Sequence, residues 1–362
     1  MTRALGSCGI VVYRFTGGID AIDEYSRRLI GALRANGSEV VYMSNGLSPL
    51  RSRSADPAWV LLQYNAFRYG KWGFAPGLVR DALLLQRRRG VRLSIMIHEA
   101  WVPMTDWRST LMGIWQRAQL RTLVCLADRV MTSTEALARE IGRGAVHTPI
   151  ASNITPVPTS RAAARERLDL GDKLTVALFG RAHPSRALDY AEAAITALAD
   201  AHGAQRLAVL NLGADAPPLH VSPEVEVRSP GCQTEDELSL GLAASDVMLL
   251  PFADGISTRR GTLMAALAHG VPVLGLNGHN TDAVLAQAAD AIVLTPVGDR
   301  AAFVRAVVEL TRDPARMRAT GDAGRRLYES RFGWPVLAGT VASQLDTMDH
   351  AGAATVAATK AR

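Results

Sequence analysis

The stretch from Leu249 to Leu274 combines residue types that can bind a phosphate group. Its opening apolar run ends at Pro251 and predicts a buried strand, after which a polar loop with glycine follows. Thr262 begins a run of helix formers that Gly270 can end before Pro272. Free backbone N–H groups and the helix dipole meet where such a loop enters a helix. The arrangement therefore favours an anion such as a diphosphate.

Side chains of the same loop add to this chemistry. Arg259 and Arg260 carry fixed positive charge, and Asp254 is an acid within the loop. The candidate donor-binding residues here are Ser257, Thr258, Arg259, Arg260, Gly261 and Thr262. An ordinary strand-to-helix turn with two solvated arginines accounts equally well for the stretch, so both interpretations stay open.

A second strand-to-helix turn carries a similar pair of arginines. The sequence predicts a strand from Leu174 to Phe179, then a turn from Gly180 to Arg186, then a helix at about 187–201. Arg181 and Arg186 flank this turn and could clamp a diphosphate between two guanidinium groups.

His98 follows the strongly apolar strand predicted from Leu93 to Ile97. In doubly wound sheets, residues just beyond the carboxyl ends of the strands face the ligand crevice. His98 is therefore better placed for chemistry than a histidine on a helix face. A structural cap at the end of the strand is the alternative.

An aromatic and basic loop separates two of the predicted elements. Five aromatic side chains fall among the eleven residues from Tyr64 to Phe74, and they could stack on a sugar or an apolar acceptor. A packed loop explains them as well. With the residues after His98, the acceptor candidates are Tyr64, Asn65, Phe67, Tyr69, Trp72, Glu99 and Trp101.

Strands and helices alternate along the chain, which predicts an α/β fold. The expected organisation is a Rossmann-like domain at 1–150, a linker at 151–165 and a second Rossmann-like domain at 166–333. Two prolines and several hydroxyl residues without periodicity mark the linker. A final helix is expected at 334–350, and a disordered tail at 351–362.

Bulk properties agree with this plan. A chain of 362 residues is too long for one ordinary core, and 48% hydrophobic with 20% charged residues is typical of a globular protein. Cys8, Cys125 and Cys232 have no metal-binding spacing and no disulfide framework, which fits a reducing cytosol. The first apolar run is too short for a signal peptide, and none could span a bilayer. A cytoplasmic location is expected, with a peripheral position at the inner membrane face as an option.

Charge is distributed unevenly. Residues 1–150 carry 20 Lys and Arg against 11 Asp and Glu, a net charge of +9, whereas 151–362 carry 20 against 23, a net charge of −3. The basic half could face an anionic acceptor or an anionic membrane surface, and greater solubility is the alternative. Nucleic acid is not expected as a partner, because the arginines are dispersed and no nucleic-acid-binding motif is present.

Together these features resemble the retaining GT-B glycosyltransferases (group 1, family 4-like). The resemblance rests on Gly17-Gly18 after the first strand, His98, the segment 179–186 and the stretch 249–274, in this order. It implies two Rossmann-like domains facing each other across a cleft, with the C-terminal helix crossing back to the N-terminal domain. It also implies a nucleotide diphosphate-sugar donor bound mainly by the second domain and an acceptor bound by the first.

The resemblance assigns roles to individual residues. Gly17 and Gly18 would let a loop approach the diphosphate, and Arg181 and Arg186 would bind it, although Arg186 stands where the family usually has lysine. His98 would touch the transferred sugar. Asp254 is assigned as the acid at the donor sugar, and Gly231 and Cys232 as contacts to the nucleobase.

One departure from the family concerns its pair of glutamates eight residues apart. Counting from the first acid gives Asp254 and Thr262, and counting back from Gly270 gives Ser257 and Ala265. In both alignments the second carboxylate is missing, which affects the contacts to the ribose and the choice of nucleotide.

The resemblance thus implies a retaining, metal-independent hexosyltransferase that uses UDP- or GDP-sugar and needs no cofactor. Its acceptor would be a sugar or a lipid-linked or natural-product molecule. A non-catalytic sugar-nucleotide-binding protein is the first alternative. A Rossmann oxidoreductase is the second, although no G-x-G-x-x-G follows the first strand.

Overall fold

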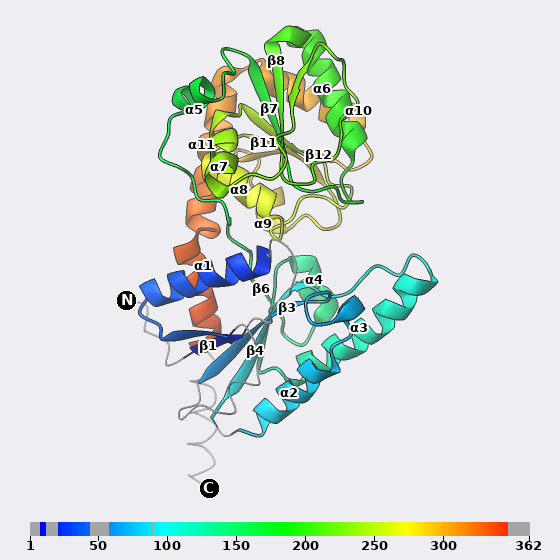
Figure 1. Ribbon diagram of the computed structural model, residues 1–362, viewed down its shortest axis with the longest axis vertical. Helices are drawn as coiled ribbons and strands as arrows, with labels where there is room; N and C mark the ends of the chain where they lie inside the picture. Colours follow the sequence, from blue (N-terminus) through cyan, green and yellow to red (C-terminus); the bar gives the residue numbers. More distant parts are fainter. Residues whose placement is uncertain (1–7, 12–20, 44–57, 89, 347–362) are drawn as a thin grey trace. The chain divides into compact units, whose positions relative to one another are not determined.

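The computed structural model describes residues 8–11, 21–43, 58–88 and 90–346. The chain divides into two compact units, which Figure 1 shows with their elements labelled. Unit 1 contains the chain up to Pro149 and from Trp334 onward, and unit 2 runs from Ile150 to Gly333. Each unit is built on a six-stranded sheet.

Unit 1 has the strand order β2-β1-β3-β4-β5-β6, and every described pair of strands is parallel. The order reverses between β1 and β3, where doubly wound sheets open their ligand crevice at the carboxyl ends of the strands. Its elements are β1 (Cys8–Val11), α1 (Ala21–Ala35), β2 (Val40–Met43), β3 (Trp59–Asn65), the 3₁₀ helix η2 (Lys71–Gly73), α2 (Pro76–Gln86), β4 (Arg92–Glu99), α3 (Trp107–Leu126), β5 (Arg129–Thr132), α4 (Glu135–Ile141), β6 (Val146–His147) and a final helix at 334–346.

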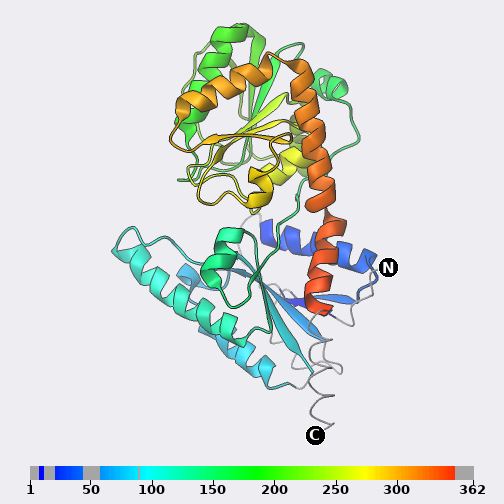
Figure 2. The same ribbon diagram turned by 180° about the vertical axis from the view of Figure 1, so that it is seen from behind.

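Helices cover both faces of this sheet. Apolar side chains of α1 recur at helical spacing, and Tyr25, Leu29, Ile30 and Leu33 are buried. On the other face α2 and α3 pack over β3 and β4, as Figures 1 and 2 show. The strands are buried on both sides, so β3 begins with a continuous apolar run at 59–62.

Unit 2 repeats the plan with the order β12-β11-β10-β7-β8-β9, which reverses between β7 and β10. Its described pairs are again parallel. Its elements are α5 (Arg161–Arg167), β7 (Leu174–Phe179), α6 (Leu188–His202), the 3₁₀ helix η3 (Ala204–Arg206), β8 (Leu207–Leu212), β9 (Glu226–Arg228), α7 (Glu235–Ala244), β10 (Val247–Leu250), α8 (Gly261–His269), β11 (Val273–Asn277), α9 (Ala283–Ala286), β12 (Ile292–Pro296), α10 (Arg300–Thr311) and α11 (Pro314–Arg331).

The helix α8 is the most deeply buried helix of those that bear on the site. Every residue from Leu263 to His269 is buried, because α8 packs between the sheet and α7 and α11. Gly270 ends the helix in the left-handed conformation, as its sequence position predicts. A helix held this firmly fixes its N-terminus at the carboxyl edge of the sheet.

Several sequence expectations need adjustment. The strand expected to end at Ile97 continues to Glu99, so His98 lies within β4. Residues 161–167, which fall partly in the expected linker, form the helix α5. Thr234 and Glu237 form a capping box at the start of α7. Among the described residues, no helix has the length and apolar character needed to cross a membrane.

Candidate functional site

Two loops are joined at the carboxyl edge of the unit 2 sheet, at its reversal point. The loop after β7 and the loop after β10 pair through backbone hydrogen bonds from Ala187 N to Pro251 O (2.8 Å) and from Ala253 N to Ser185 O (2.7 Å). Arg186 and Phe252 form an antiparallel bridge between them. The two arginine-bearing turns that the sequence singled out are therefore neighbours.

A third loop, between β11 and α9, fixes the backbone of the loop after β10. The carboxylate Oδ2 of Asp282 accepts hydrogen bonds from Thr258 N (2.7 Å) and Thr258 Oγ1 (2.8 Å). Asn280 N donates to Asp254 O, and Ile256 N to Leu276 O, each at 2.9 Å. Ser257 and Thr258 are fully buried as a result, and the Ser257 hydroxyl has no partner among the described residues.

Gly255 allows these loops to approach one another. Its φ is +92°, and a Cβ atom there would lie 2.4 Å from Thr281 Oγ1 and 2.6 Å from Gly278 N. Gly203 has the same φ of +92° and nothing within 4 Å of the equivalent position. Alanine substitutions at these two glycines therefore separate the effect of backbone conformation from the effect of crowding.

We expect Gly255→Ala to lower the free energy of unfolding of unit 2 by about 2–3 kcal/mol more than Gly203→Ala does. Both variants place alanine at an unfavourable φ, but only the first forces backbone atoms of two loops apart. Denaturant unfolding followed by the fluorescence and ellipticity of the purified variants measures the difference. Equal losses in the two variants would contradict the close contact.

An ion-pair network orders the arginines of the loop after β10. Arg260 donates to both carboxylate oxygens of Asp254 at 2.9 and 3.0 Å, and its guanidinium lies 4.0 Å from the centre of the Phe252 ring. Arg259 lies 3.5 Å from the same carboxylate, and Asn280 Nδ2 donates to it at 3.1 Å. Asp254 is predicted as a catalytic acid. In the structure its carboxylate oxygens pair with the loop arginines and orient them.

Arg186 is a buried cation at the end of β7. Its guanidinium donates to Gly180 O at 2.8 Å and to Phe179 O at 3.2 Å, and it has no carboxylate partner among the described residues. Burial, and then the charge of Arg260, lower the pKa of Arg186. Its charged form is therefore less stable than in water, and a nearby anion would stabilise it.

Arg181 differs from Arg186 in both exposure and partner. Its side chain is 73% exposed and forms an ion pair with Asp215, a residue of the loop after β8. A solvated pair of this kind is weak, so Arg181 is available to bind an anionic ligand.

The N-terminus of α8 lies beside these arginines. Its first turn has no side-chain cap, and a Cβ atom at Gly261 would meet nothing within 4 Å. Thr262 lies against Gly180, since a Cβ atom on that glycine would be 3.2 Å from Thr262 Cγ2. Uncapped N–H groups, an open approach and nearby arginines are features that favour an anion, so this edge is the candidate anion site.

The residues assigned to the nucleobase follow the edge strand β9. Gly231 has a φ of +77° and open space around it, and Cys232 is an exposed, free thiol. Of the positions considered for the missing second acid, Ala265 is fully buried within α8 and Thr262 is partly exposed. In this structure a carboxylate at 265 would be enclosed by apolar side chains.

The carboxyl edge of the unit 1 sheet carries His98. The register between β3 and β4 shifts at its end, with Tyr64 opposite Ile97 but Asn65 opposite Glu99, so His98 is the extra residue of a bulge. Bulges re-aim a side chain at the end of a strand and are common next to active sites. Gly17 and Gly18 lie outside the described residues.

The imidazole of His98 is half-buried and neutral. Its Nε2 lies 2.7 Å from Gln63 Oε1, so with this amide orientation Nε2 is the protonated nitrogen and Nδ1 the acceptor. The Tyr25 ring packs edge-on at 5.0 Å. Burial, followed by the charge of Arg68, lowers the pKa of His98 to about 4. His98 can therefore exchange hydrogen bonds with a sugar without carrying charge at neutral pH.

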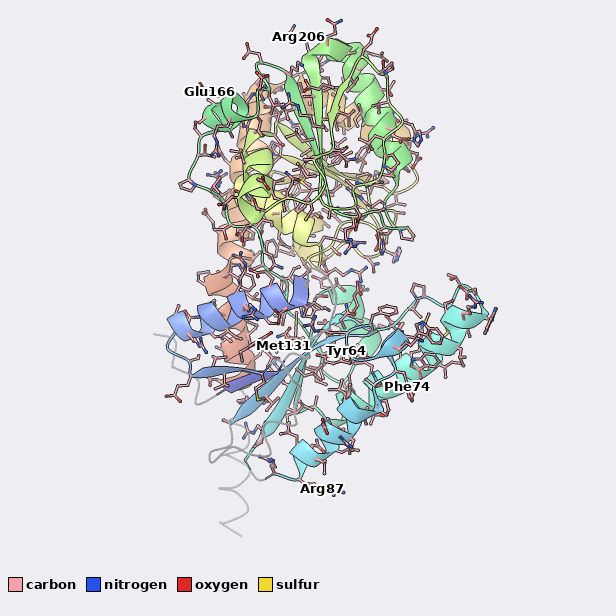
Figure 3. The ribbon with its side chains drawn as sticks, viewed as in Figure 1. Tyr64, Phe74, Arg87, Met131, Glu166 and Arg206 are labelled. Carbon is pink, nitrogen blue, oxygen red and sulfur yellow. The ribbon has the colours of Figure 1, made fainter. Side chains whose placement is uncertain are left out.

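The acceptor candidates separate into buried and accessible groups. Tyr64, labelled in Figure 3, and Tyr69 are stacked on each other in the core and are closed to an acceptor. Burial raises the pKa of Tyr64 to about 12. The Asn65 amide donates to the Glu99 carboxylate at 2.9 Å near the bulge. Phe67 and Trp72 are exposed, and Trp101 lies half-buried under the Arg117 guanidinium.

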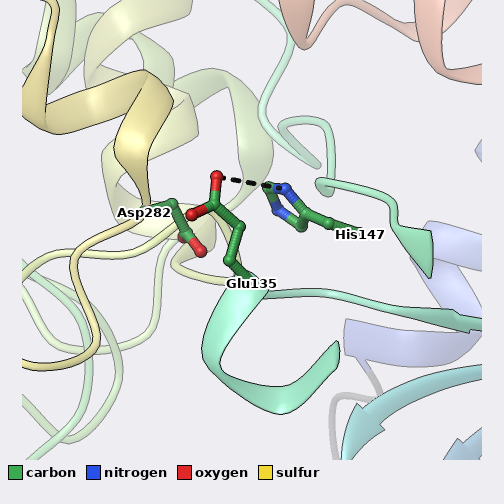
Figure 4. Close-up of side chains that lie close together, drawn as sticks. All are labelled: Glu135, His147 and Asp282. Atoms are coloured by element: carbon green, nitrogen blue, oxygen red, sulfur yellow. Dashed lines mark ion pairs between the residues drawn. The ribbon is translucent and has the colours of Figure 1, made fainter. Parts of the chain in front are cut away.

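A further polar pair lies at the same sheet edge. His147 at the end of β6 and Glu135 at the start of α4 form an ion pair with 3.8 Å between Nδ1 and Oε1, as Figure 4 shows. Both side chains are partly buried. The pair extends the row of polar groups that follows β3 and β4.

Sequence reasoning did not select several residues that organise the two edges. In unit 2 these are Ser185, Asp215, Asn280 and Asp282, and in unit 1 Tyr25, Gln63 and Arg68. The rule that polar groups after buried parallel strands face the ligand would have found the first four. Tyr25 lies on the helix α1, and no feature of the sequence marks it as a site residue.

Comparison with known proteins is informative at the level of structure. No family model matches the chain, and no curated protein matches it. The chain is similar to sucrose-phosphate synthase from Thermosynechococcus elongatus, with 15% identity, 96% of this chain and 100% of that chain covered, and a TM-score of 0.67.

Two other similar structures add to this comparison. One is HepE from Anabaena in complex with UDP-glucose, with 12% identity, coverage of 94% and 100%, and a TM-score of 0.64. The other is WaaG, a glycosyltransferase involved in lipopolysaccharide biosynthesis, with 13% identity, coverage of 93% and 99%, and a TM-score of 0.58. The chain has the GT-B fold of two Rossmann-like domains, and the fold expected from the sequence is confirmed.

Proposed function

We propose that the protein is a glycosyltransferase that moves a sugar from a nucleotide diphosphate-sugar to an acceptor, with retention of anomeric configuration and without a metal ion. The observation that carries the proposal is the anion site of unit 2. Arg186, Arg259 and Arg260 and the uncapped N-terminus of α8 converge at one sheet edge. A similar structure binds UDP-glucose, and another is described as a glycosyltransferase, which supports the assignment.

In this proposal the diphosphate lies at the unit 2 edge. As the bond between the anomeric carbon and the diphosphate oxygen breaks, negative charge grows on the leaving group. Fixed arginines and helix N–H groups stabilise that charge without reorganising, which is the role a metal ion has in other transferases. The acceptor hydroxyl oxygen forms the new bond, and its proton passes to the departing diphosphate.

We assign the transferred sugar to His98. Its neutral ring offers Nδ1 as an acceptor to a sugar hydroxyl, while Gln63 holds Nε2. Hydrogen bonds to the sugar that strengthen as the ring flattens lower the barrier. Glu99 and Trp101 are the nearest polar and aromatic groups in sequence for an acceptor, and Phe67 is an exposed aromatic group of the same unit. We further propose that the protein acts in the cytoplasm.

The diphosphate assignment predicts that Arg181→Ala weakens the binding of the preferred nucleoside diphosphate about tenfold, which equals about 1.4 kcal/mol. Isothermal titration calorimetry with UDP, GDP, ADP and TDP identifies the nucleotide and measures the change. Arg300→Ala is the matched control, because Arg300 is also an exposed arginine of unit 2 with a weak acidic partner, Asp189. Equal affinities of wild type and Arg181→Ala would remove Arg181 from the site.

Metal independence is tested by chelation. The sequence contains no Asp-x-Asp pair, and arginines serve the leaving group, so turnover should survive EDTA unchanged. The assay is release of the nucleoside diphosphate with and without chelator, followed by addition of Mn²⁺ or Mg²⁺. Activity that is lost and then restored by metal would contradict this part of the proposal. Glu135 and His147 would then be the first ligands to replace.

A further inference from the structure

The first two turns of α3 carry an apolar stripe on their outer side. Trp107, Leu111 and Ile114 are 71%, 52% and 57% exposed. Their spacing of four and three residues places them on one helix face, which Ala118 and Arg121 continue. The opposite face, with Gly113, Gln116, Leu120 and Leu123, is the one buried against unit 1. Figures 1 and 2 show α3 on the outside of this unit.

The 3₁₀ helix η2 enlarges this stripe into a patch. Trp72 and Phe74 are also mostly exposed, and they lie against α3 through Trp115, whose Nε1 donates to Trp72 O at 3.2 Å. Figure 3 labels Phe74 beside α3. Trp72 has a φ of +57°, a left-handed conformation that is rare for an aromatic residue. We call Trp72, Phe74, Trp107, Leu111 and Ile114 the α3 patch.

Basic side chains surround the α3 patch. Lys71 lies 5.3 Å from the Trp72 ring centre and Arg108 lies 5.2 Å from that of Trp107, while Arg117 and Arg121 follow along α3. The helix contains no acidic residue. Residues 58–127 carry ten Lys and Arg against three Asp and Glu, a net charge of +7. None of these four cations has an acidic partner among the described residues.

We propose that the α3 patch docks on the surface of an anionic lipid bilayer. Exposed tryptophans and aliphatic side chains with a cationic border match the boundary between lipid headgroups and acyl chains. A second copy of this chain is a poorer occupant, because a symmetric contact would bring two strongly positive surfaces together. Such a surface would hold the enzyme where lipid-linked molecules are found, although docking itself does not depend on the proposed transfer reaction.

The proposal is tested with vesicles of phosphatidylcholine alone and of an equimolar mixture of phosphatidylcholine and phosphatidylglycerol. Wild-type protein should co-float with the anionic vesicles, with a partition coefficient at least about tenfold higher than for phosphatidylcholine alone. The triple variant Trp107→Ser, Leu111→Ser, Ile114→Ser should lower binding to the anionic vesicles by about 100-fold or more. The variant Arg108→Glu, Arg121→Glu should lower it at least about tenfold.

The control variant replaces the exposed valines of unit 2, Val227→Ser with Val297→Ser, and should bind as wild type does. All substitutions are at exposed positions, so melting temperatures and nucleotide binding should stay near those of the wild type. Equal binding to both kinds of vesicle, or binding to neither, would overturn the proposal. Sedimentation that shows a dimer broken by the triple variant, without lipid binding, would also overturn it and assign the patch to a second copy.

Discussion

His98→Ala should lower the rate of sugar transfer about 100-fold while the affinity for the free nucleoside diphosphate stays the same. The free nucleotide lacks the sugar that His98 contacts, so only the reaction should respond. A loss of one positioned polar group has this size in other enzymes. Because the pKa of His98 is lowered to about 4, the ring stays neutral from pH 5 to 8, and its titration should not appear in the rate profile over that range.

The matched control for this result is His202→Ala. His202 is also half-buried and has a lowered pKa, but it lies at the end of α6 and contacts Thr311 Oγ1. This variant should keep its transfer rate. A folded His98→Ala protein with near-normal transfer would make His98 a structural cap of β4. A parallel loss of nucleotide binding would instead place it at the nucleotide.

Arg186→Met should weaken the binding of the nucleoside diphosphate about 100-fold, or roughly 3 kcal/mol. The guanidinium of Arg186 is buried, lies near Arg260 and has no carboxylate partner among the residues described here. A cation in that position gains more from a bound anion than an exposed one does. The loss should therefore exceed the tenfold effect expected for Arg181→Ala.

Arg186→Lys is the companion variant that separates charge from packing. It keeps the positive charge and removes the forked hydrogen bonds to Phe179 O and Gly180 O. If the charge binds the diphosphate, the lysine variant should retain most of the affinity, and both proteins should bind more weakly at high salt. Equal, large losses in Arg186→Lys and Arg186→Met would show that Arg186 acts only by ordering the end of β7.

Much of the fold follows from local patterns in the chain. The strand β7 begins and ends where its apolar run predicts, because a strand buried on both faces of a parallel sheet is a continuous apolar run. The ends of other elements depend on pairing between distant segments. The bulge that positions His98 depends on the register between β3 and β4. No local sequence pattern predicts that register.

The candidate site was predictable in outline and less so in its contacts. Charged residues in strand-to-helix turns indicated the candidate anion site, since those turns lie at the carboxyl edge of a parallel sheet. The sequence did not reveal that Arg186 turns inward, or that Asp282 from a later loop holds Thr258. It also did not separate buried aromatic side chains such as Tyr64 from exposed ones such as Trp72, because the loop has no periodicity.

The central claim is that this chain transfers sugar from a nucleotide diphosphate-sugar. The most direct measurement is release of nucleoside diphosphate from UDP-, GDP-, ADP- and TDP-sugars by the purified protein, followed by NMR with water as the acceptor. We expect slow release from one nucleotide class, sugar that first appears with the anomeric configuration of the donor, and about a 100-fold lower rate for His98→Ala. Binding without release would indicate a sugar-nucleotide-binding protein, and a folded protein that neither binds nor cleaves any of these donors would contradict the account.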